Sequence, residues 1–309
     1  MVAVNRTQPK RAKTSDSQYT LVEFMKSFPD DLACLNWLWR QRFSEDGEHA
    51  FCPKCESVRS FKRYESHQLR ASWTCIACGN HVHPLAGTIF EKSSTSLHLW
   101  FYAMYLMVST KCGISAKQLE RELGVTYKTA WRMANLIRKY LMEQTDKPLS
   151  GIVEADETYI GGKRRGTPRG RPSEDSHKQA VFGMVERRGE VRAMTVKNVK
   201  AATLLPHLQK RVIPASAVYT DELRSYNKLP KSGYEHRSVN HSENVYVSGN
   251  VHTNTIEGFW SLTKRGIGGV YHSVSAKHLQ GYLNEYAWRY NHRTGGQFET
   301  LLLRAAAGS

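Results

Sequence analysis

The sequence contains two C-x-x-C pairs, CPKC at Cys52 and Cys55 and CIAC at Cys75 and Cys78, with 19 residues between the pairs. Each pair presents two thiolates from one tight turn, and two such turns complete a tetrahedron of sulfur ligands around zinc. A site of this kind stabilises a segment that is too small to build its own hydrophobic core. The pattern therefore predicts a zinc ribbon with one structural Zn²⁺; four unrelated reduced cysteines are the alternative.

The charge of the chain indicates a polyanionic partner. Lys and Arg number 44 against 28 Asp and Glu in 309 residues, a formal charge of +16, which favours nucleic acid as the partner. The apolar stretch LHLWFYAMYLMV at residues 97–108 is shorter than a bilayer requires and predicts a buried helix. The first 20 residues lack the apolar segment of a signal peptide. We therefore expect a cytoplasmic, nucleoid-associated protein without a membrane partner.

Residues 113–141, GISAKQLERELGVTYKTAWRMANLIRKYL, have the pattern of a helix-turn-helix. Ser115 predicts the cap of a first helix, Gly124 its end, and Thr126 the cap of a second helix. In such motifs the start of the second helix enters the major groove, so the candidate DNA contacts are Lys128, Thr129 and Arg132. An ordinary helical pair is the alternative interpretation.

Three acidic residues lie at positions of chemical interest. In GIVEADETYIGG, Asp156 lies inside an apolar strand, where an acid is costly unless it is paired, bound to metal or solvated. Alternation puts Glu154 and Asp156 on one face of that strand and Glu157 on the other. Asp221 ends the short apolar strand SAVYTD, and Glu257 lies near the start of a predicted helix in HTNTIEGFWSLTKRG.

Glu257 has both a local and a catalytic interpretation. With Asn254 it fits a capping box. Lys264, however, follows seven residues later, and two helical turns place both side chains on one face. Carboxylates from two strands and one helix suit a pair of Mg²⁺ ions that clamp an in-line phosphoryl displacement. Asp156, Asp221 and Glu257 are therefore candidate metal ligands, with solvated strand-end carboxylates as the alternative.

The order of predicted elements indicates a multidomain chain. Residues 18–92 read as a small β-rich zinc-ribbon domain and residues 93–148 as a helix-turn-helix-like, α-helical DNA-binding region. Residues 149–293, where strands come first and then alternate with helices, predict an α/β domain with a mixed sheet. Residues 1–17 are expected to be a disordered basic tail and residues 294–309 a C-terminal tail.

Five motifs together resemble one family: CPKC…CIACGNHVHPLAGTIFE, VEADETYIGGK, VYTDELRSY, VHTNTIEGFWSLTKRGIGGVYHSVSAKHL and YLNEYAWRYNHR. The sequence resembles bacterial insertion-sequence transposases of the DDE class, in the ISXO2-like group related to Merlin elements. The resemblance implies an RNase H-like catalytic core and a catalytic triad of Asp156, Asp221 and Glu257. Lys264 would be an accessory residue that contacts DNA. Some members of the group carry Asn at the third position, which keeps Asn254 as the alternative to Glu257.

The resemblance also implies an activity and its partners. The enzyme would cut DNA at the terminal inverted repeats of an insertion sequence and join the freed 3′-hydroxyl to target DNA, with two Mg²⁺ ions, or Mn²⁺ in their place. Its partners would be double-stranded DNA, both transposon ends and target, within a homodimer or a higher synapse. The basic loop at residues 163–171 and the helix after Glu257 add candidate DNA contacts at Lys163, Arg164, Arg165 and Arg265.

Three other functions are kept as alternatives. A zinc-ribbon and helix-turn-helix regulator would bind DNA without cutting it, and the carboxylates argue against this class. A host nuclease on the same core would cut without joining. A domesticated transposase would lack strand transfer, and the retained acids argue against it.

Overall fold

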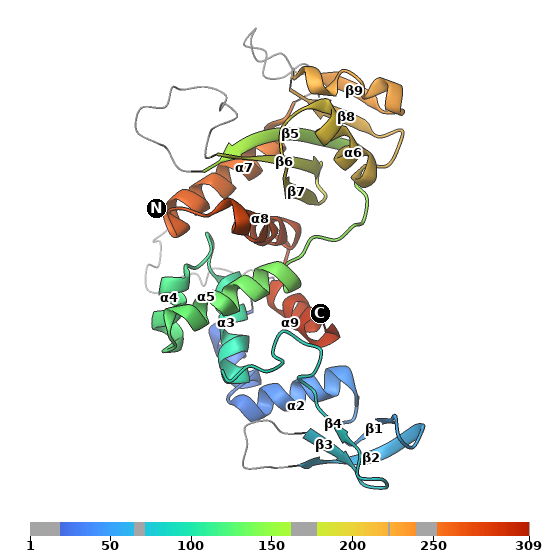
Figure 1. The fold of residues 1–309 in the computed structure, drawn as a ribbon, viewed down its shortest axis with the longest axis vertical. Coiled ribbons are helices and arrows are strands. Elements are labelled where there is room, and N and C mark those ends of the chain that lie inside the picture. The colour runs from blue at the N-terminus through green and yellow to red at the C-terminus, as the bar shows by residue number, and fades with distance from the viewer. Residues whose placement is uncertain (1–18, 65–71, 162–177, 222, 239–251, 309) are drawn as a thin grey trace, which may run out of the picture. The chain divides into compact units, whose positions relative to one another are not determined.

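The computed structural model describes residues 19–64, 72–161, 178–221, 223–238 and 252–308. The chain divides into two compact units, one of Met1–Ser109 with His292–Gly308 and one of Thr110–Asn291 (Figure 1). The predicted tail at residues 1–17 lies outside the described residues. The predicted helix-turn-helix region at residues 93–148 is divided, because its first helix belongs to the first unit and the rest to the second.

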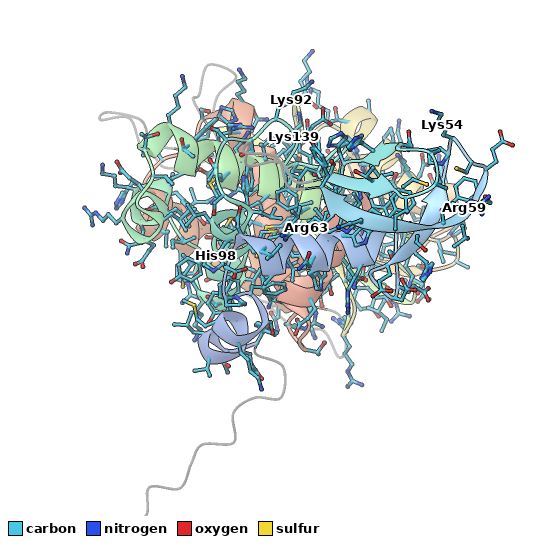
Figure 2. All side chains as sticks on the ribbon, turned by 90° about the horizontal axis from the view of Figure 1, so that it is seen from below. Lys54, Arg59, Arg63, Lys92, His98 and Lys139 are labelled. Atoms are coloured by element: carbon cyan, nitrogen blue, oxygen red, sulfur yellow. The ribbon has the colours of Figure 1, made fainter. Side chains whose placement is uncertain are left out.

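The cysteine-rich part of the first unit is a four-stranded antiparallel sheet in the order β1-β2-β3-β4. Its strands are β1 His49–Cys52, β2 Ser57–Tyr64, β3 Ser72–Cys75 and β4 His81–Val82. The core is small: the stacked rings of Trp39 and Trp73, 4.6 Å apart, pack with Phe61 and the cysteines. Lys54 and Arg59 project outward from this sheet (Figure 2). So small a core needs a further stabilising element.

The helices of the first unit are α1 Leu21–Ser27, α2 Asp31–Arg42, α3 Leu97–Ser109 and α9 Gln297–Ala307. Seven residues of α3 are buried, which confirms the buried helix predicted over residues 97–108. A packed helix, α9, stands where a C-terminal tail was expected over residues 294–309. The chain turns at Gly295 and Gly296, both with positive φ, and the apolar residues that follow recur at helical spacing. Phe298 and its neighbours thereby pack against α2 and α3.

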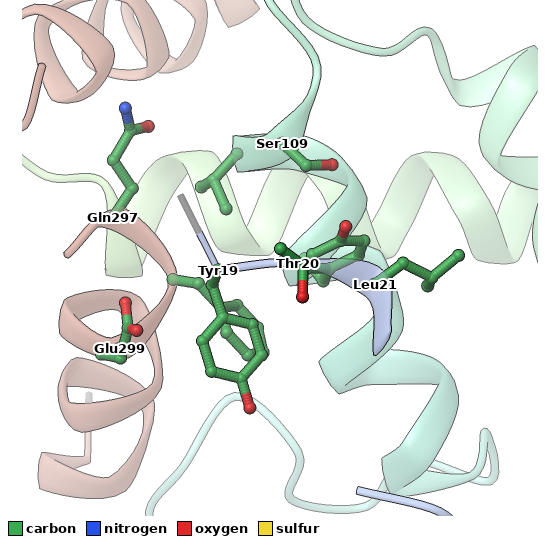
Figure 3. Close-up of a pocket in the computed structure, with 9 residues that line it drawn as sticks. Tyr19, Thr20, Leu21, Ser109, Gln297 and Glu299 are labelled. Atoms are coloured by element: carbon green, nitrogen blue, oxygen red, sulfur yellow. The ribbon is translucent and has the colours of Figure 1, made fainter. Parts of the chain in front are cut away.

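A cavity of about 320 Å³ lies in the first unit beside the start of α1 (Figure 3). Its walls include Tyr19, Ser109 and Gln297. Glu299 is the acid on its lining, and the other lining side chains are uncharged. This cavity therefore offers no set of groups for catalysis.

The second unit begins with the two helices that the sequence predicted, α4 Ala116–Leu123 and α5 Tyr127–Leu136. The Ser115 side chain accepts a hydrogen bond from the Gln118 N–H, and Gly124 ends α4 in the left-handed conformation. The Thr126 side chain accepts from the Thr129 N–H and caps α5. Local capping chemistry thus sets both ends of the turn where they were predicted.

A buried ion pair ties this helical pair to the rest of the unit. Arg138 lies in the π-helical turn Ile137–Leu141 that follows α5, and its Nε donates to Glu285 Oε2 over 2.7 Å. Glu285 lies in α8, Ala276–Asn291, and also accepts from Tyr271 and Arg289. The Arg138 guanidinium covers the ring of Tyr282 at 4.3 Å. The helical pair is therefore fixed to α8.

The second unit is built on a mixed five-stranded sheet in the order β7-β6-β5-β8-β9. The strands are β5 Ile152–Ile160, β6 Gln179–Glu186, β7 Val191–Thr195, β8 Ala217–Thr220 and β9 Glu235–Ser238. β5, β6 and β7 pair antiparallel, whereas β8 lies parallel to both β5 and β9. A 3-2-1-4-5 order with an antiparallel second strand fits the RNase H-like core that the resemblance implied.

Alternating side chains of the central strands supply two cores, one on each face of the sheet. Phe182 and Met184 of β6 pack with α6, Ala201–Arg211, on one face. Val181 and Val185 of the same strand pack on the other face with α8 and with α7, Asn254–Gly266. Helices therefore cover both faces, and β5 lies at the centre between two cores.

A glycine allows α7 to lie close to the sheet. Gly183 of β6 pairs directly with Asp156 of β5, and Trp260 and Ile256 of α7 occupy the space above it. A Cβ atom on Gly183 would lie 2.4 Å from Trp260 Cζ2. A larger residue there would push α7 away from the strand that carries Asp156.

We therefore expect Gly183→Ala to lower the free energy of unfolding by about 1–3 kcal/mol, because it overpacks this contact. Gly258→Ala is the matched control. It lies in the interior of the same helix with no atom within 4 Å of the added Cβ, so it should raise stability by about 0.5–1 kcal/mol. Thermal unfolding measures both, and equal effects of the two variants would contradict this account.

Candidate active site

Three carboxylates meet at the end of two parallel strands. Asp156 and Glu157 lie in β5, Asp221 follows the last residue of β8, and one oxygen of each lies within 4.8 Å of the others. β8 pairs with β5 only as far as Glu154. The edge of β5 beyond that residue is therefore open on the side where Asp221 lies. The acids lie close together here because β8 ends before β5 does, so that Asp221 follows β8 beside the part of β5 that β8 leaves unpaired.

Glu157 is a member of this group that the sequence did not predict. Alternation placed it on the face opposite Asp156, and its backbone position obeys that rule. Its side chain nevertheless reaches the open strand edge, where the buried phenol of Tyr226 donates to Glu157 Oε2 over 2.8 Å. The signal in the sequence was the pair of consecutive acids in an apolar strand.

The surroundings of Asp156 oppose its ionisation. Burial, and then the nearby carboxylates of Glu157, Asp221 and Glu257, raise the pKa of Asp156 to about 8. Two of the predicted acids, Asp221 and Glu257, thus act on the third, together with Glu157. Such a concentration of negative charge could hold a cation, because a cation would relieve the repulsion that helps to hold the proton on Asp156.

Glu257 and Lys264 approach this point from α7. Glu257 Oε1 accepts a hydrogen bond from Thr253 Oγ1 over 2.7 Å, and Glu257 is close enough to contribute to the raised pKa of Asp156. Burial lowers the pKa of Lys264, and the negative charge of Asp156 partly offsets that effect. One face of α7 thus brings an acid and a base to the β5 acids, as their seven-residue spacing predicted.

Asn254 does not cap α7, although the sequence suggested that role. It is the first residue of α7 rather than the cap, and its side chain is exposed. The preceding residue, Thr253, makes no side-chain cap. The backbone N–H groups of Thr255 and Ile256 donate instead to Glu154 of β5. The capping box that Asn254 and Glu257 were predicted to form is therefore not the cap of α7.

The structure describes some of the predicted DNA-contact residues. Lys128 and Arg132 are exposed on the outer side of α5, and Thr129 is half-buried beside its hydrogen bond to Thr126. Arg265 is exposed on α7, where its Nε donates to the carbonyl of Ser261. The remaining candidates lie outside the described residues: Lys163, Arg164 and Arg165.

The four cysteines form a separate group in the first unit. The Sγ atoms of the four cysteines all lie within 4.8 Å of one another: Cys52, Cys55, Cys75 and Cys78. Those of Cys52 and Cys78 are 3.5 Å apart. A tetrahedron with Zn–S bonds of about 2.3 Å has an edge of about 3.8 Å. Burial opposes ionisation of Cys52, but hydrogen bonds from backbone N–H groups and Cys78 lower its pKa to about 7. The donor set fits zinc.

Among the helices of the described residues, none is long and apolar enough to cross a membrane.

The raised pKa of Asp156 predicts a pH dependence of stability. Because the folded state keeps the Asp156 proton up to a pH of about 8 and the unfolded state loses it near pH 4, the free energy of unfolding falls as pH rises between these values. Asp156→Asn removes this loss. We expect its free energy of unfolding to exceed that of wild type by an amount that grows from pH 5 to pH 8 and reaches on the order of a few kcal/mol.

Thermal unfolding without added divalent metal measures this difference. Asp146→Asn, a change at an exposed acid of the same unit, is the control and should follow the wild-type profile. A Tm difference for Asp156→Asn that shrinks as pH rises would contradict the raised pKa.

Comparison with known proteins gives one family match and two sequence relatives. A family model described as an ISXO2-like transposase domain matches residues 148–291, which contain all four acids and Lys264. An uncharacterized protein in transposable element ISH50 of Halobacterium salinarum is 29% identical over 280 residues, covering 86% of this chain and 92% of that protein. An uncharacterized transposase-like protein of Haemophilus influenzae is 38% identical over 102 residues, covering 33% of this chain and 81% of that protein.

Two solved structures give looser matches. The Mos1 Strand Transfer Complex matches with a TM-score of 0.29 and 14% identity over 66% of this chain and 75% of that one. The mariner Mos1 paired end complex with Mg matches with a TM-score of 0.25 and 14% identity over 66% and 77%. TM-scores this low carry no conclusion about this chain. The domain match and the sequence relatives suffice: the chain belongs to the ISXO2-like transposase family.

Proposed function

We propose that this chain is a DDE-class transposase that binds the terminal inverted repeats of an insertion sequence, cuts the DNA there and joins the ends to a target. The observation that carries the proposal is the close cluster of the Asp156, Glu157 and Asp221 carboxylates, with Glu257 near enough to contribute to the raised pKa of Asp156. It lies within the domain that matches the ISXO2-like family. A regulator that only binds DNA has no use for so costly a group of charges.

The acids fit Mg²⁺ or Mn²⁺. All are hard oxygen donors, and one oxygen each of Asp156, Glu157 and Asp221 lies within 4.8 Å of the others. Glu257 is near enough to contribute to the raised pKa of Asp156. Mg²⁺ and Mn²⁺ retain open positions for phosphate and water. Asp156, Asp221 and Glu257 would hold these ions. When bound, a pair of such ions lowers the pKa of water and neutralises charge on the attacking and leaving oxygens of a phosphodiester.

Neighbouring side chains orient the acids, and Lys264 would hold the DNA. Thr253 orients the Glu257 carboxylate through its 2.7 Å hydrogen bond, and Tyr226 does the same for Glu157. Lys264, on the same face of α7, supplies a positive charge for a DNA phosphate beside the acids. Hydrolysis of one strand at the transposon end leaves a 3′-hydroxyl, which attacks a target phosphodiester and expels the target's own 3′-oxygen. Positioning accelerates both steps without a covalent enzyme intermediate.

DNA contacts would extend from this site to the helical pair. Lys128, Thr129 and Arg132 present polar groups at the start of α5, which suits major-groove contact. Arg265 adds a charge next to Lys264. Because the Arg138–Glu285 pair fixes the helical pair to α8, bound DNA would be held in a set position relative to the acids. Joining two ends in concert requires a homodimer or higher synapse on DNA.

The cysteine group would hold one structural Zn²⁺. Four thiolates fill a tetrahedron, which leaves no open position for catalysis. The ion would stabilise a sheet whose apolar core is small.

Cleavage and joining test the catalytic assignment. With Mg²⁺ and DNA that carries the terminal repeats, Asp156→Ala, Asp221→Ala and Glu257→Ala should each abolish nicking and strand transfer while specific binding remains, because each removes a metal ligand. Asn254→Ala is the matched change on the same helix turn and should retain both activities. The products are separated on denaturing gels.

Each alternative has its own signature in that experiment. Binding without any cleavage by wild type would favour a regulator, and cleavage without joined products a nuclease or a domesticated enzyme. Loss of activity in Asn254→Ala, with activity retained in Glu257→Ala, would make Asn254 the third catalytic residue in place of Glu257.

Metal analysis tests the zinc proposal. Elemental analysis of the full chain should give about one zinc per chain, and Cys75→Ser should lose it and expose the β1–β4 sheet to protease, because three thiolates bind zinc far more weakly. Cys112→Ser, at an exposed cysteine outside the group, should keep the metal. Equal zinc content in both variants would contradict the assignment.

A further inference from the structure

A third acid of β5, Glu154, is fully buried next to the site. Its carboxylate accepts from the Thr255 N–H at 2.8 Å, the Ile256 N–H at 3.2 Å and the Thr255 hydroxyl at 2.9 Å. Arg187 Nε donates to the same carboxylate over 2.7 Å. The buried charge is thus fully hydrogen-bonded, which is the condition for its being tolerated.

Glu154 fastens the beginning of α7 to the sheet. The first N–H groups of a helix have no partner inside the helix, and an anion there is favoured by the helix dipole. The usual local cap is absent, because the Thr253 hydroxyl donates to Glu257 instead. A strand residue 101 positions away in the chain therefore supplies the cap. α7 lies against β5 and β6 beyond this point (Figure 1).

Arg187 extends the connection to a third element. It follows the last residue of β6, and its Nη2 donates to the carbonyl of His252 just before α7 over 2.9 Å. Its guanidinium also lies 5.0 Å from the ring centroid of Tyr219 in β8. Tyr219 precedes Asp221 by two residues, so Arg187 contacts both the segment before α7 and the strand that ends at Asp221.

The contacts of Glu154 and Arg187 fall one or two residues from each proposed metal ligand. Glu154 precedes Asp156 by two residues on the same face of β5, about 6.6 Å along the strand. Ile256, which Glu154 binds, immediately precedes Glu257. The three elements that carry Asp156, Asp221 and Glu257 therefore meet at one ion pair, in which Glu154 is fully buried and Arg187 partly buried.

We propose that Glu154 and Arg187 form a positioning clamp that sets the spacing of the three acids and thereby the affinity of the site for divalent cations. The proposal rests on the proposed function, because it assumes that these acids bind the metal. Neither residue is catalytic: both act through Asp156, Asp221 and Glu257. Groups that orient metal ligands typically change metal affinity or activity about 10–100-fold when they are altered.

A merely structural ion pair offers the control. Glu285 is also fully buried and is bound by Arg138 Nε over 2.7 Å, the same chemistry as Glu154 with Arg187. It lies on α8 and accepts from Arg138 after α5, from Arg289 of α8 and from Tyr271 in the turn Ile267–Tyr271 after α7; none of these donors lies in β5, β8 or α7. Glu285→Gln should lower Tm as Glu154→Gln does, because both leave an arginine without its acid.

The measurement is the affinity of the full-length, zinc-loaded protein for Mn²⁺ without DNA. Electron paramagnetic resonance reports it, because the signal of free Mn²⁺ is lost when the ion binds. We expect Glu154→Gln to weaken Mn²⁺ binding about tenfold or more, and Glu285→Gln to bind as wild type does. The cleavage rate of Glu154→Gln should recover in part as Mn²⁺ is raised, whereas an unfolded fraction would not respond. Arg187→Lys, which keeps the charge but loses the fork of donors, should also weaken binding and serves if Glu154→Gln does not fold.

Asp156→Ala distinguishes a failure of the clamp from a failure of the metal site. If it abolishes Mn²⁺ binding while Glu154→Gln and Arg187→Lys bind as wild type, the clamp is overturned and the metal site stands. Equal weakening by Glu285→Gln would also overturn it, because general stability would then explain the effect. If wild type and Asp156→Ala bind Mn²⁺ alike, the proposed metal site fails and the clamp fails with it.

Discussion

The burial of Asp156, reinforced by the carboxylates of Glu157, Asp221 and Glu257, is the constraint on which the second unit depends. An acid buried beside three others would ordinarily be excluded from a fold, because burial and like charges both disfavour its ionised form. Here the apolar clusters on the two faces of the sheet hold β5 in place. The stability of those cores compensates for the strained electrostatics at one end of the strand, as is common where a protein carries out chemistry.

Two Arg–Glu pairs, each with a fully buried glutamate, join elements of the second unit. Arg187 with Glu154 joins the strands to α7, and Arg138 with Glu285 joins the helical pair to α8. Because a buried pair tolerates little change in geometry, each pair fixes an angle as well as a distance. The proposed DNA-reading helix and the proposed metal ligands thus belong to one compact unit, which suits an enzyme that must cut at a set distance from a recognised sequence.

Local chemistry was predictable from the sequence, and side-chain reach was not. Ser115, Gly124 and Thr126 act on neighbours a few residues away, so their caps could be predicted. Asp221 was predictable because strand ends carry polar groups. Glu157 was missed because alternation describes where a side chain leaves the backbone, not where its carboxylate ends once a neighbouring strand has stopped. The role of Glu154 was missed because its partners lie 33 and 101 positions away. No local pattern reveals such a contact.

The central claim is that these acids form one divalent-cation site. Anomalous X-ray scattering at the manganese edge, from crystals of the protein soaked in Mn²⁺, tests it most directly. The account predicts an anomalous peak between the carboxylates of Asp156 and Asp221, with Glu257 turned toward it or toward a second peak. Manganese bound elsewhere, with these carboxylates without metal at saturating Mn²⁺, would contradict the account.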